Sequence, residues 1–200
     1  MADFDDFLET LKKAAAALRE ADVPFLLGGG LASWARGGPE SDHDLDLMVK
    51  PEDAERAVKA LEGTGLRIAD PPEEWLYKAW DGDVLLDLIF EPSGGPVDDA
   101  MFERADELDV AAVTMRVMAL EDVMVTKLLS LREHEVDYES VLEISRALRE
   151  QIDWDEVWRR TSDSPYARAF FYLSEQLGIL GVERASPSGS DSSRVPSGQA

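Results

Sequence analysis

The sequence predicts an α/β fold of the α+β kind, in which a mixed β-sheet core has flanking helices and is followed by a helical C-terminal part. Two observations lead to this prediction. Short apolar runs alternate with amphipathic segments over residues 1–118, and such alternation is typical of strands and helices packed in layers. From Leu120 onward, every periodic segment has apolar residues at helical spacing.

The elements expected in residues 1–118 follow from apolar periodicity and turn residues. Residues 4–20 repeat apolar positions at helical spacing, whereas residues 23–28 are a short apolar run that ends in glycine and predicts a buried strand. Asp81-Gly82-Asp83 separates two apolar runs and indicates a hairpin. Further helices are expected at 31–36, 51–61 and 97–105, and further strands at 45–49, 65–70, 74–80, 84–90 and 112–118.

The remainder of the chain is expected to contain helices and a tail. Asp153 and Ser164 have the side chains that N-caps prefer. Residues 183–200 contain no aromatic residue and one large aliphatic residue, so disorder is expected there. Helices are expected at 120–132, 138–150, 153–161 and 164–179. The predicted organisation is an α/β core over 1–118, a helical region over 119–182 and a disordered tail over 183–200.

The composition restricts the class of protein. The chain has 42 acidic and 20 basic residues, which gives a formal net charge of −22. A field of this sign opposes binding to phosphate backbones, so nucleic acid is not expected as the main partner. The acidity also has a simpler reading as an aid to solubility. The sequence shows no cysteine, no signal-peptide pattern and no apolar run that could span a membrane, so a cytoplasmic protein is expected.

Asp44 and Asp46 stand at the start of the predicted strand 45–49. Alternate residues of a strand share a face, so these two carboxylates are expected to project together. Adjacent carboxylates ionise at a cost unless a cation is present, and oxygen-rich sites of this kind suit Mg²⁺ or Mn²⁺. The alternative is a polar strand start that is simply solvated.

Asp87 and the glycines Gly28 to Gly30 extend this pattern. Asp87 interrupts an apolar strand, where a lone carboxylate is costly unless it is paired or bound to metal. The alternatives are a position at the strand end or a structural hydrogen bond. The glycines lie between a strand and a helix, where backbone N–H groups accept an anion such as a triphosphate. A tight turn explains the glycines equally well.

Together these residues resemble a known signature. Gly29-Gly30, thirteen intervening residues and then Asp44-Leu45-Asp46-Leu47 are similar to the motif of the nucleotidyltransferase superfamily with the DNA polymerase β-type fold. The likeness is greatest to minimal nucleotidyltransferases of the aminoglycoside and lincosamide adenylyltransferase type and to the AbiEii/MNT toxin–antitoxin group. Gly28 falls outside the spacing of this motif.

The resemblance implies a role for each matching residue. Gly29 and Gly30, with Ser33, would hold the triphosphate of an NTP. Asp44 and Asp46 would bind Mg²⁺ or Mn²⁺. The third carboxylate of the superfamily matches Asp87, which would bind the catalytic metal or take a proton from the acceptor hydroxyl.

The same resemblance extends to the helix predicted at 120–132. Lys127 would neutralise phosphate charge, and its alternative reading is a solvated lysine on an amphipathic helix. Arg132 and Asp137 also match the family pattern and read equally well as a helix ion pair. Asp42 has no assigned role, whereas His43 is expected to point away from the metals and to have a packing or substrate-side role.

The implied function is transfer of NMP, with ATP as a candidate donor, to a hydroxyl of a small molecule or protein. The alternative is a toxin–antitoxin-type interaction protein that keeps the fold but has little turnover, and for which a protein partner is expected. Trp75, Tyr77 and Trp80 of the predicted hairpin are read as core or edge residues rather than as a surface for stacking bases.

Overall fold

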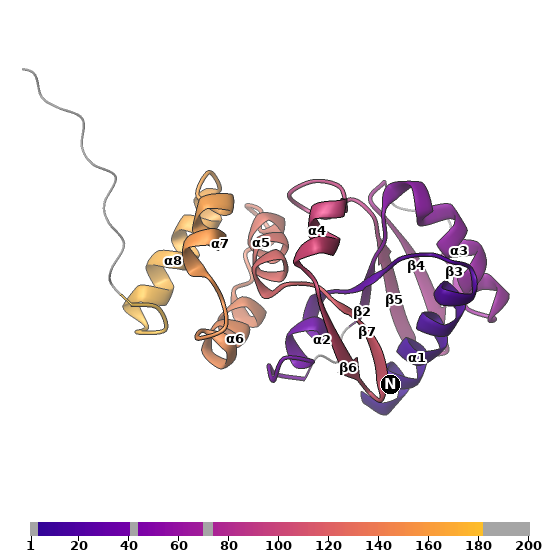
Figure 1. Ribbon diagram of the computed structural model, residues 1–200. Coiled ribbons are helices and arrows are strands. Elements are labelled where there is room, and N and C mark those ends of the chain that lie inside the picture. The colour runs from indigo at the N-terminus through magenta and orange to yellow at the C-terminus, as the bar shows by residue number, and fades with distance from the viewer. Residues whose placement is uncertain (1–3, 41–43, 70–73, 182–200) are drawn as a thin grey trace, which may run out of the picture.

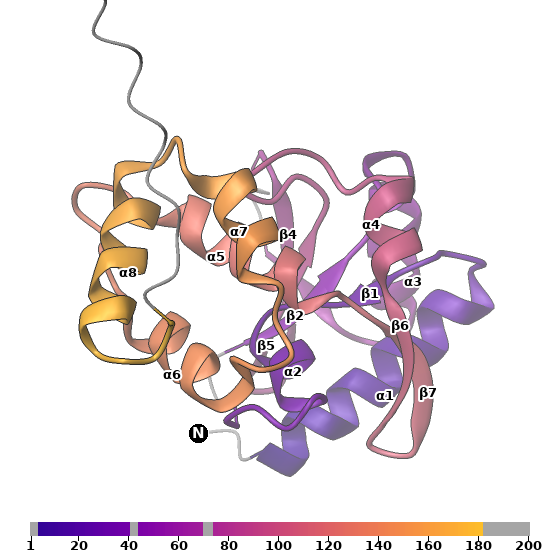
Figure 2. The same ribbon diagram turned by 60° about the vertical axis from the view of Figure 1, so that its left-hand side comes forward.

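The protein folds into a lobe that contains a β-sheet and a lobe made of helices (Figure 1). The computed structural model describes residues 4–40, 44–69 and 74–181. Over these residues the fold is α/β, with a seven-stranded mixed sheet and eight α-helices, which confirms the predicted class. Figure 2 shows α5 to α8 beside the sheet-containing lobe from a second direction.

The sheet brings the strands that carry the predicted carboxylates together. Its strand order is β3-β4-β5-β2-β1-β7-β6. The pairs β2–β5 and β1–β7 are parallel, and the other neighbours are antiparallel. β2 and β5 are therefore adjacent strands in the interior of the sheet. The strands are β1 (Leu26–Leu27), β2 (Leu45–Met48), β3 (Arg67–Ile68), β4 (Leu76–Asp81), β5 (Val84–Ile89), β6 (Asp106–Val110) and β7 (Val113–Val117).

Helices α1 and α3 pack on each other and cover one face of this sheet (Figure 1). Leu45, Leu47, Leu86 and Leu88 project into that interface and are fully buried. Residues that alternate with them, including Asp46 and Asp87, project from the opposite face. The helices of this lobe are α1 (Phe4–Glu20), α2 (Gly29–Trp34), a 3-10 helix (Pro51–Asp53) that leads into α3 (Ala54–Gly63), and α4 (Asp99–Arg104).

The helical lobe begins after β7, and its predicted caps are confirmed. The side chain of Asp153 accepts hydrogen bonds from the N–H groups of Asp155 and Glu156, and that of Ser164 accepts one from Ala167. Each cap satisfies N–H groups that have no partner within the helix. The helices are α5 (Leu120–Ser130), α6 (Glu139–Leu148), α7 (Trp154–Thr161) and α8 (Pro165–Gln176). Across the described ranges, no helix has the length and apolar character needed to cross a membrane.

Helix α5 contributes to two separate hydrophobic cores. One core is formed by the sheet, α1 and α3 and includes Val123 of α5. The other is formed by the helical lobe and includes Leu120, Met124 and Leu128 of the same helix. The predicted boundary at 118/119 stays a prediction, and the predicted tail lies outside the described residues.

Strand β6 is absent from the sequence prediction, for two reasons. Its sequence, Asp-Glu-Leu-Asp-Val, is dominated by acidic residues that strands disfavour. Its hairpin to β7 turns at Ala111 and Ala112, which adopt positive φ angles of 50° and 65°. Turns of this geometry are normally marked by Asn or Gly, so an Ala-Ala pair gives no turn signal.

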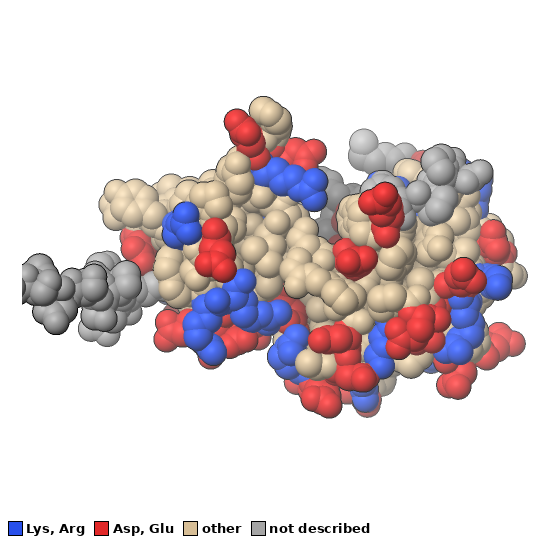
Figure 3. Space-filling model, turned by 90° about the horizontal axis from the view of Figure 1, so that it is seen from above, with Lys and Arg blue, Asp and Glu red and all other residues tan. Residues whose placement is uncertain are grey.

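Charged side chains are spread over the face of the molecule seen in Figure 3. Acidic and basic residues are interspersed around its edge, and its middle is mostly uncharged. On this face the strong negative charge of the chain is therefore dispersed rather than gathered into one acidic patch.

One buried carboxylate joins the two lobes. Asp122 of α5 is fully buried. Its Oδ2 and Oδ1 accept hydrogen bonds of 2.9 Å from Nε and Nη2 of Arg104, at the end of α4. Arg160 of α7 places its Nη2 2.6 Å from Asp122 Oδ1. Asp122 therefore bridges two guanidinium groups, one from each lobe.

We expect Asp122→Ala to lower the free energy of unfolding by about 2–4 kcal/mol, because two partly buried cations lose their counter-charge. Urea unfolding measures this change. Glu9→Gln is the control, since Glu9 forms only an exposed pair with Lys12 and its loss costs less than about 0.5 kcal/mol. Equal effects of the two substitutions would show that Asp122 does not stabilise the lobe junction.

Candidate active site

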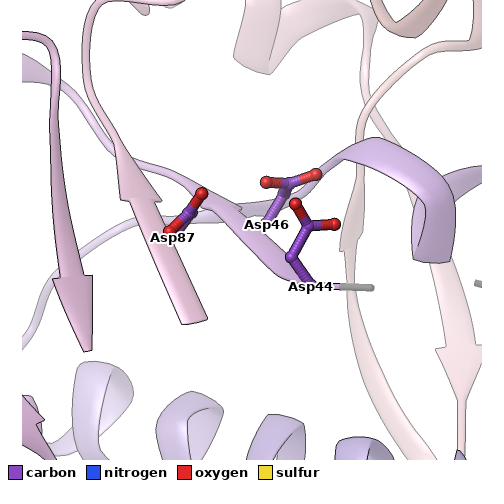
Figure 4. A group of neighbouring side chains, drawn as sticks. All are labelled: Asp44, Asp46 and Asp87. Atoms are coloured by element: carbon purple, nitrogen blue, oxygen red, sulfur yellow. The ribbon is translucent and has the colours of Figure 1, made fainter. Parts of the chain in front are cut away.

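Three aspartates predicted from the sequence lie together on the face of the sheet that is opposite to α1 and α3. Asp46 of β2 is directly paired with Asp87 of β5, and Asp44 precedes β2 by one residue. Each offers a carboxylate oxygen, and these oxygens lie within 4.8 Å of one another. Figure 4 shows all three carboxylates pointing to the same side of the sheet. Asp87 is 8% exposed and the other two are half-buried.

Gly29 brings the backbone of α2 against this cluster. It is the first residue of α2 and has a φ of +54°, and a Cβ at this position would lie 1.7 Å from Asp46 Oδ2. Gly28 also lies close to β2, because a Cβ there would lie 2.7 Å from the Met48 Cε, and its N–H donates to the Asp46 carbonyl at 2.9 Å. The first N–H groups of a helix have no intrahelical partner. The glycines thus place the start of a helix beside a carboxylate cluster.

The charges of the cluster act strongly on Asp46. The pKa of Asp46 is raised to about 8, with burial as the largest cause and the negative charges of Asp44 and Asp87 acting in the same direction, whereas Lys127 lowers the pKa. Lys127 comes from α5, so the helical lobe supplies a cation to the site. A carboxylate with so high a pKa is stabilised in its ionised form by added positive charge. The donor set therefore fits a divalent metal ion, with three carboxylates available as ligands.

The raised pKa of Asp46 predicts a pH-dependent stability. Because the pKa is about 8 in the folded protein and 3.8 as a free side chain, the folded state binds more protons than the unfolded state between these values. Stability is therefore highest at low pH within this range and falls as the pH rises toward 8. The loss is on the order of a few kcal/mol, since a change of one in a pKa corresponds to about 1.4 kcal/mol and partial exposure reduces the effect.

Mg²⁺ should reverse this loss, because the ion binds the ionised carboxylates. Thermal unfolding with Mg²⁺ and with chelator should show a larger stabilisation near pH 8 than near pH 5. Asp46→Asn should remove most of both the pH dependence and the Mg²⁺ effect. A stabilisation by Mg²⁺ that is equal at both pH values, or unchanged in the variant, would exclude Asp46 as the group responsible.

The remaining predicted residues lie at different distances from the cluster. Gly30 follows Gly29 in α2. Ser33 is fully buried and its hydroxyl donates to the Gly29 carbonyl at 3.4 Å, so a contact between Ser33 and phosphate stays a prediction. Lys127 is half-buried on α5 and acts on Asp46. Asp42 and His43 lie outside the described residues.

The interpretation of Arg132 and Asp137 as a helix ion pair is wrong. Helix α5 ends at Ser130 and α6 begins at Glu139, so both residues lie in the connecting loop. Asp137 accepts a hydrogen bond from the backbone N–H of Glu139 at 2.8 Å, while the backbone of Arg132 pairs with that of Glu135. Because neither residue lies in a helix, the two cannot form an ion pair along one.

Two neighbours of the site were missed by the sequence reasoning. Gly28 falls outside the motif spacing, yet it lies against Met48 and its N–H binds the backbone carbonyl of Asp46. Lys78 has no part in the motif, although the hairpin pairs it with Asp87. The sequence does contain the information that places Lys78 opposite Asp87, because the turn at Gly82-Asp83 fixes the register of the two strands.

Comparison with solved structures supports the fold. The structure of ANT(2'')-Ia in complex with adenylyl-2''-tobramycin aligns with a TM-score of 0.60 at 19% identity, over 83% of this chain and 97% of that chain. The lincosamide antibiotic adenylyltransferase LnuA, bound to lincomycin, aligns with a TM-score of 0.53 at 14% identity, over 72% and 97% of the two chains. At these identities the likeness establishes a shared fold. No match was found among curated proteins.

Comparison with family sequence profiles identifies the family directly. Residues 6–177 match the profile described as "Uncharacterised nucleotidyltransferase". The matched segment runs from α1 to the end of α8 and contains the glycines, the three aspartates and Lys127. The match confirms the resemblance drawn from the glycine–aspartate spacing, and the chain belongs to this nucleotidyltransferase family.

Proposed function

We propose that the protein is a metal-dependent enzyme that transfers NMP from an NTP, with ATP as the first candidate, to a hydroxyl of a small molecule or protein. The main support for this proposal is the arrangement of Asp44, Asp46 and Asp87 beside α2. The three carboxylates lie within 4.8 Å of one another, and they face Gly29, the first residue of α2, where there is no room for a side chain. Such a site can hold metal ions and triphosphate next to each other.

Each residue has a defined part in the proposed reaction. Asp44 and Asp46 would hold Mg²⁺ or Mn²⁺, and Asp87 would complete the ligand set or act on the acceptor. The N–H groups at Gly29 and Gly30 would bind phosphate oxygens. A bound divalent ion supplies stabilisation of the attacking and leaving oxygens in an in-line displacement.

Bond exchange, proton transfer and neutralisation of phosphate charge make up the proposed step. The acceptor oxygen forms a bond to the α-phosphorus as the bond to pyrophosphate breaks. Asp87, the most buried of the three carboxylates, would accept the proton of the acceptor hydroxyl. Lys127 would neutralise phosphate charge from the side of α5, a role that its electrostatic effect on Asp46 supports.

The structural neighbours make a small-molecule acceptor the first to test. The matched structures contain adenylyl-2''-tobramycin in one case and lincomycin in the other. Antibiotics with free hydroxyl groups are therefore reasonable initial acceptors, while a protein hydroxyl remains part of the proposal.

The proposal is tested with NTPs labelled at the α- or γ-phosphate. We expect an acceptor in a cell extract, or the protein itself, to retain the α-label and not the γ-label in the presence of Mg²⁺, and mass spectrometry to show an added NMP. Transfer of the γ-label would indicate phosphoryl transfer instead. No transfer from any of the NTPs would favour the alternative, an interaction protein that keeps the fold without turnover.

A further inference from the structure

The strand order places Gly29 and Asp87 on opposite sides of Asp46. Gly29 follows β1, whereas Asp87 lies on β5, and the order β4-β5-β2-β1 separates these positions. In an in-line displacement the acceptor oxygen approaches from the side opposite to the leaving pyrophosphate. With the triphosphate at the glycines, as the proposed function has it, the acceptor approaches from the side of β5 and β4.

The hairpin register determines which side chains lie on that side. Lys78 is paired with Asp87, Trp80 with Leu85, and Arg67 of β3 with Trp80. Paired residues, and residues two apart on a strand, project from the same face. Arg67, Lys78, Trp80 and Leu85 therefore continue the face of the sheet that carries the carboxylates. We call these four residues the acceptor surface.

The acceptor surface is accessible to a ligand. Arg67 is exposed, and Lys78, Trp80 and Leu85 are half-buried, whereas Leu86 on the other face is fully buried beneath helices. The Arg67 guanidinium lies over the Trp80 ring, 5.9 Å from its centroid. Indole and guanidinium groups both offer flat faces on which a planar ring can lie.

The charge of the acceptor surface is opposite to that of the whole chain. The formal net charge of the chain is −22. On this face, within the described residues of β3, β4 and β5, the charged side chains are Arg67, Lys78 and the carboxylate of Asp87. Lys78 lies directly across from Asp87, so its charge is offset by that carboxylate, whereas the Arg67 guanidinium lies over Trp80 at the outer end of the surface. This outer cation favours a ligand with negative charge, while the acidity elsewhere opposes a long polyanion such as RNA.

We propose that the acceptor surface binds the nucleotidyl acceptor, and that this acceptor is a small molecule with a flat ring and a phosphate or carboxylate group. The ring lies against Leu85 and the Arg67–Trp80 pair, and the anionic group binds at Arg67, with Lys78 and its Asp87 neighbour on the inner side of the ring. Strand geometry sets Leu85 about 7 Å from Asp87 along β5. A hydroxyl on the ring therefore reaches Asp87 without a long linker.

Titration with 8-anilinonaphthalene-1-sulfonate, a flat anionic dye, tests the proposal by fluorescence. The protein is first saturated with Mg²⁺ and the α,β-methylene analogue of ATP, so that the nucleotide site is filled. We expect Arg67→Glu to weaken dye binding at least about tenfold and Lys78→Gln to weaken it several-fold. Arg149→Glu is the control, because Arg149 lies at the end of α6 and is half exposed. Its dye affinity should match that of the wild type.

Three results would overturn the inference. The first is equal dye affinity in Arg67→Glu and Arg149→Glu. The second is displacement of bound dye when the nucleotide analogue is added afterwards, and the third is tighter binding of the flat cation proflavine than of the anionic dye. Dye titration without the analogue needs neither nucleotide nor turnover, so it separates this inference from the proposed function. Dye binding that depends on Arg67 in a chain without transfer activity would contradict the proposed function alone. Unchanged kcat/KM for an identified acceptor in Arg67→Glu would contradict the acceptor surface alone.

Discussion

Asp46→Asn is expected to abolish nucleotidyl transfer while leaving the fold intact. Asn keeps the shape of the side chain but removes the charge that would hold the metal, whose stabilisation of the transition state is worth several kcal/mol. We therefore expect kcat/KM to fall by at least about a thousandfold. Transfer of α-labelled NTP measures the loss, and thermal unfolding near pH 8 should show equal or greater stability, because a buried charge with a raised pKa has been removed.

Asp99→Asn is the matched control for this prediction. Asp99 is also an aspartate with a single cationic partner, Lys50, but its side chain is 83% exposed and lies in the first turn of α4. It should retain full transfer activity. Asp44→Asn should behave as Asp46→Asn does. Retained transfer in both Asp44→Asn and Asp46→Asn would exclude the carboxylate cluster as the metal site.

Gly29→Ala is expected to reduce transfer by at least about a hundredfold, although it adds only one methyl group. The new Cβ would lie 1.7 Å from Asp46 Oδ2, so the carboxylate must leave its place in the cluster. Displacement of a reacting group by about 1 Å commonly costs a hundredfold in rate. Mg²⁺ titration followed by thermal unfolding should show a parallel loss of metal binding.

Gly178→Ala separates this effect from backbone strain. Gly178 has a φ of +66°, close to the +54° of Gly29, but a Cβ there meets no atom within 4 Å. Both substitutions lower the free energy of unfolding by about 1 kcal/mol, because alanine disfavours a positive φ. Only Gly29→Ala should lose activity and metal binding. Equal activity in the two variants would show that close packing of Gly29 on Asp46 is unimportant for the reaction.

Much of the site could be predicted because it depends on short sequence distances. Strand periodicity places Asp44 and Asp46 on one face, and the motif spacing selects Gly29-Gly30 as the partner glycines. Asp87 is conspicuous because a carboxylate interrupts an apolar strand. Its pairing with Asp46 could not be predicted locally, because it depends on the parallel alignment of β2 and β5 in the folded sheet.

Other features depend on contacts that local patterns do not record. Strand β6 is held by its pairing with β7 despite an acidic sequence and an Ala-Ala turn. The loop between α5 and α6 contains charges at helical spacing but is not helical. The close approach of Gly28 to Met48 joins residues that are twenty positions apart in the chain. In each case tertiary packing overrides the local signal.

Helix α5 makes the candidate active site a joint product of both lobes. One of its sides belongs to the core of the sheet and another to the core of the helices, and Asp122 ties it to Arg104 and Arg160. The same helix presents Lys127 to Asp46. A shift in how α7 seats on α5 would therefore move an ammonium group relative to the carboxylates. The two lobes have separate hydrophobic cores, but both contribute charged groups to the candidate site. Substitutions in the helical lobe that move α5 are therefore expected to change the pKa of Asp46.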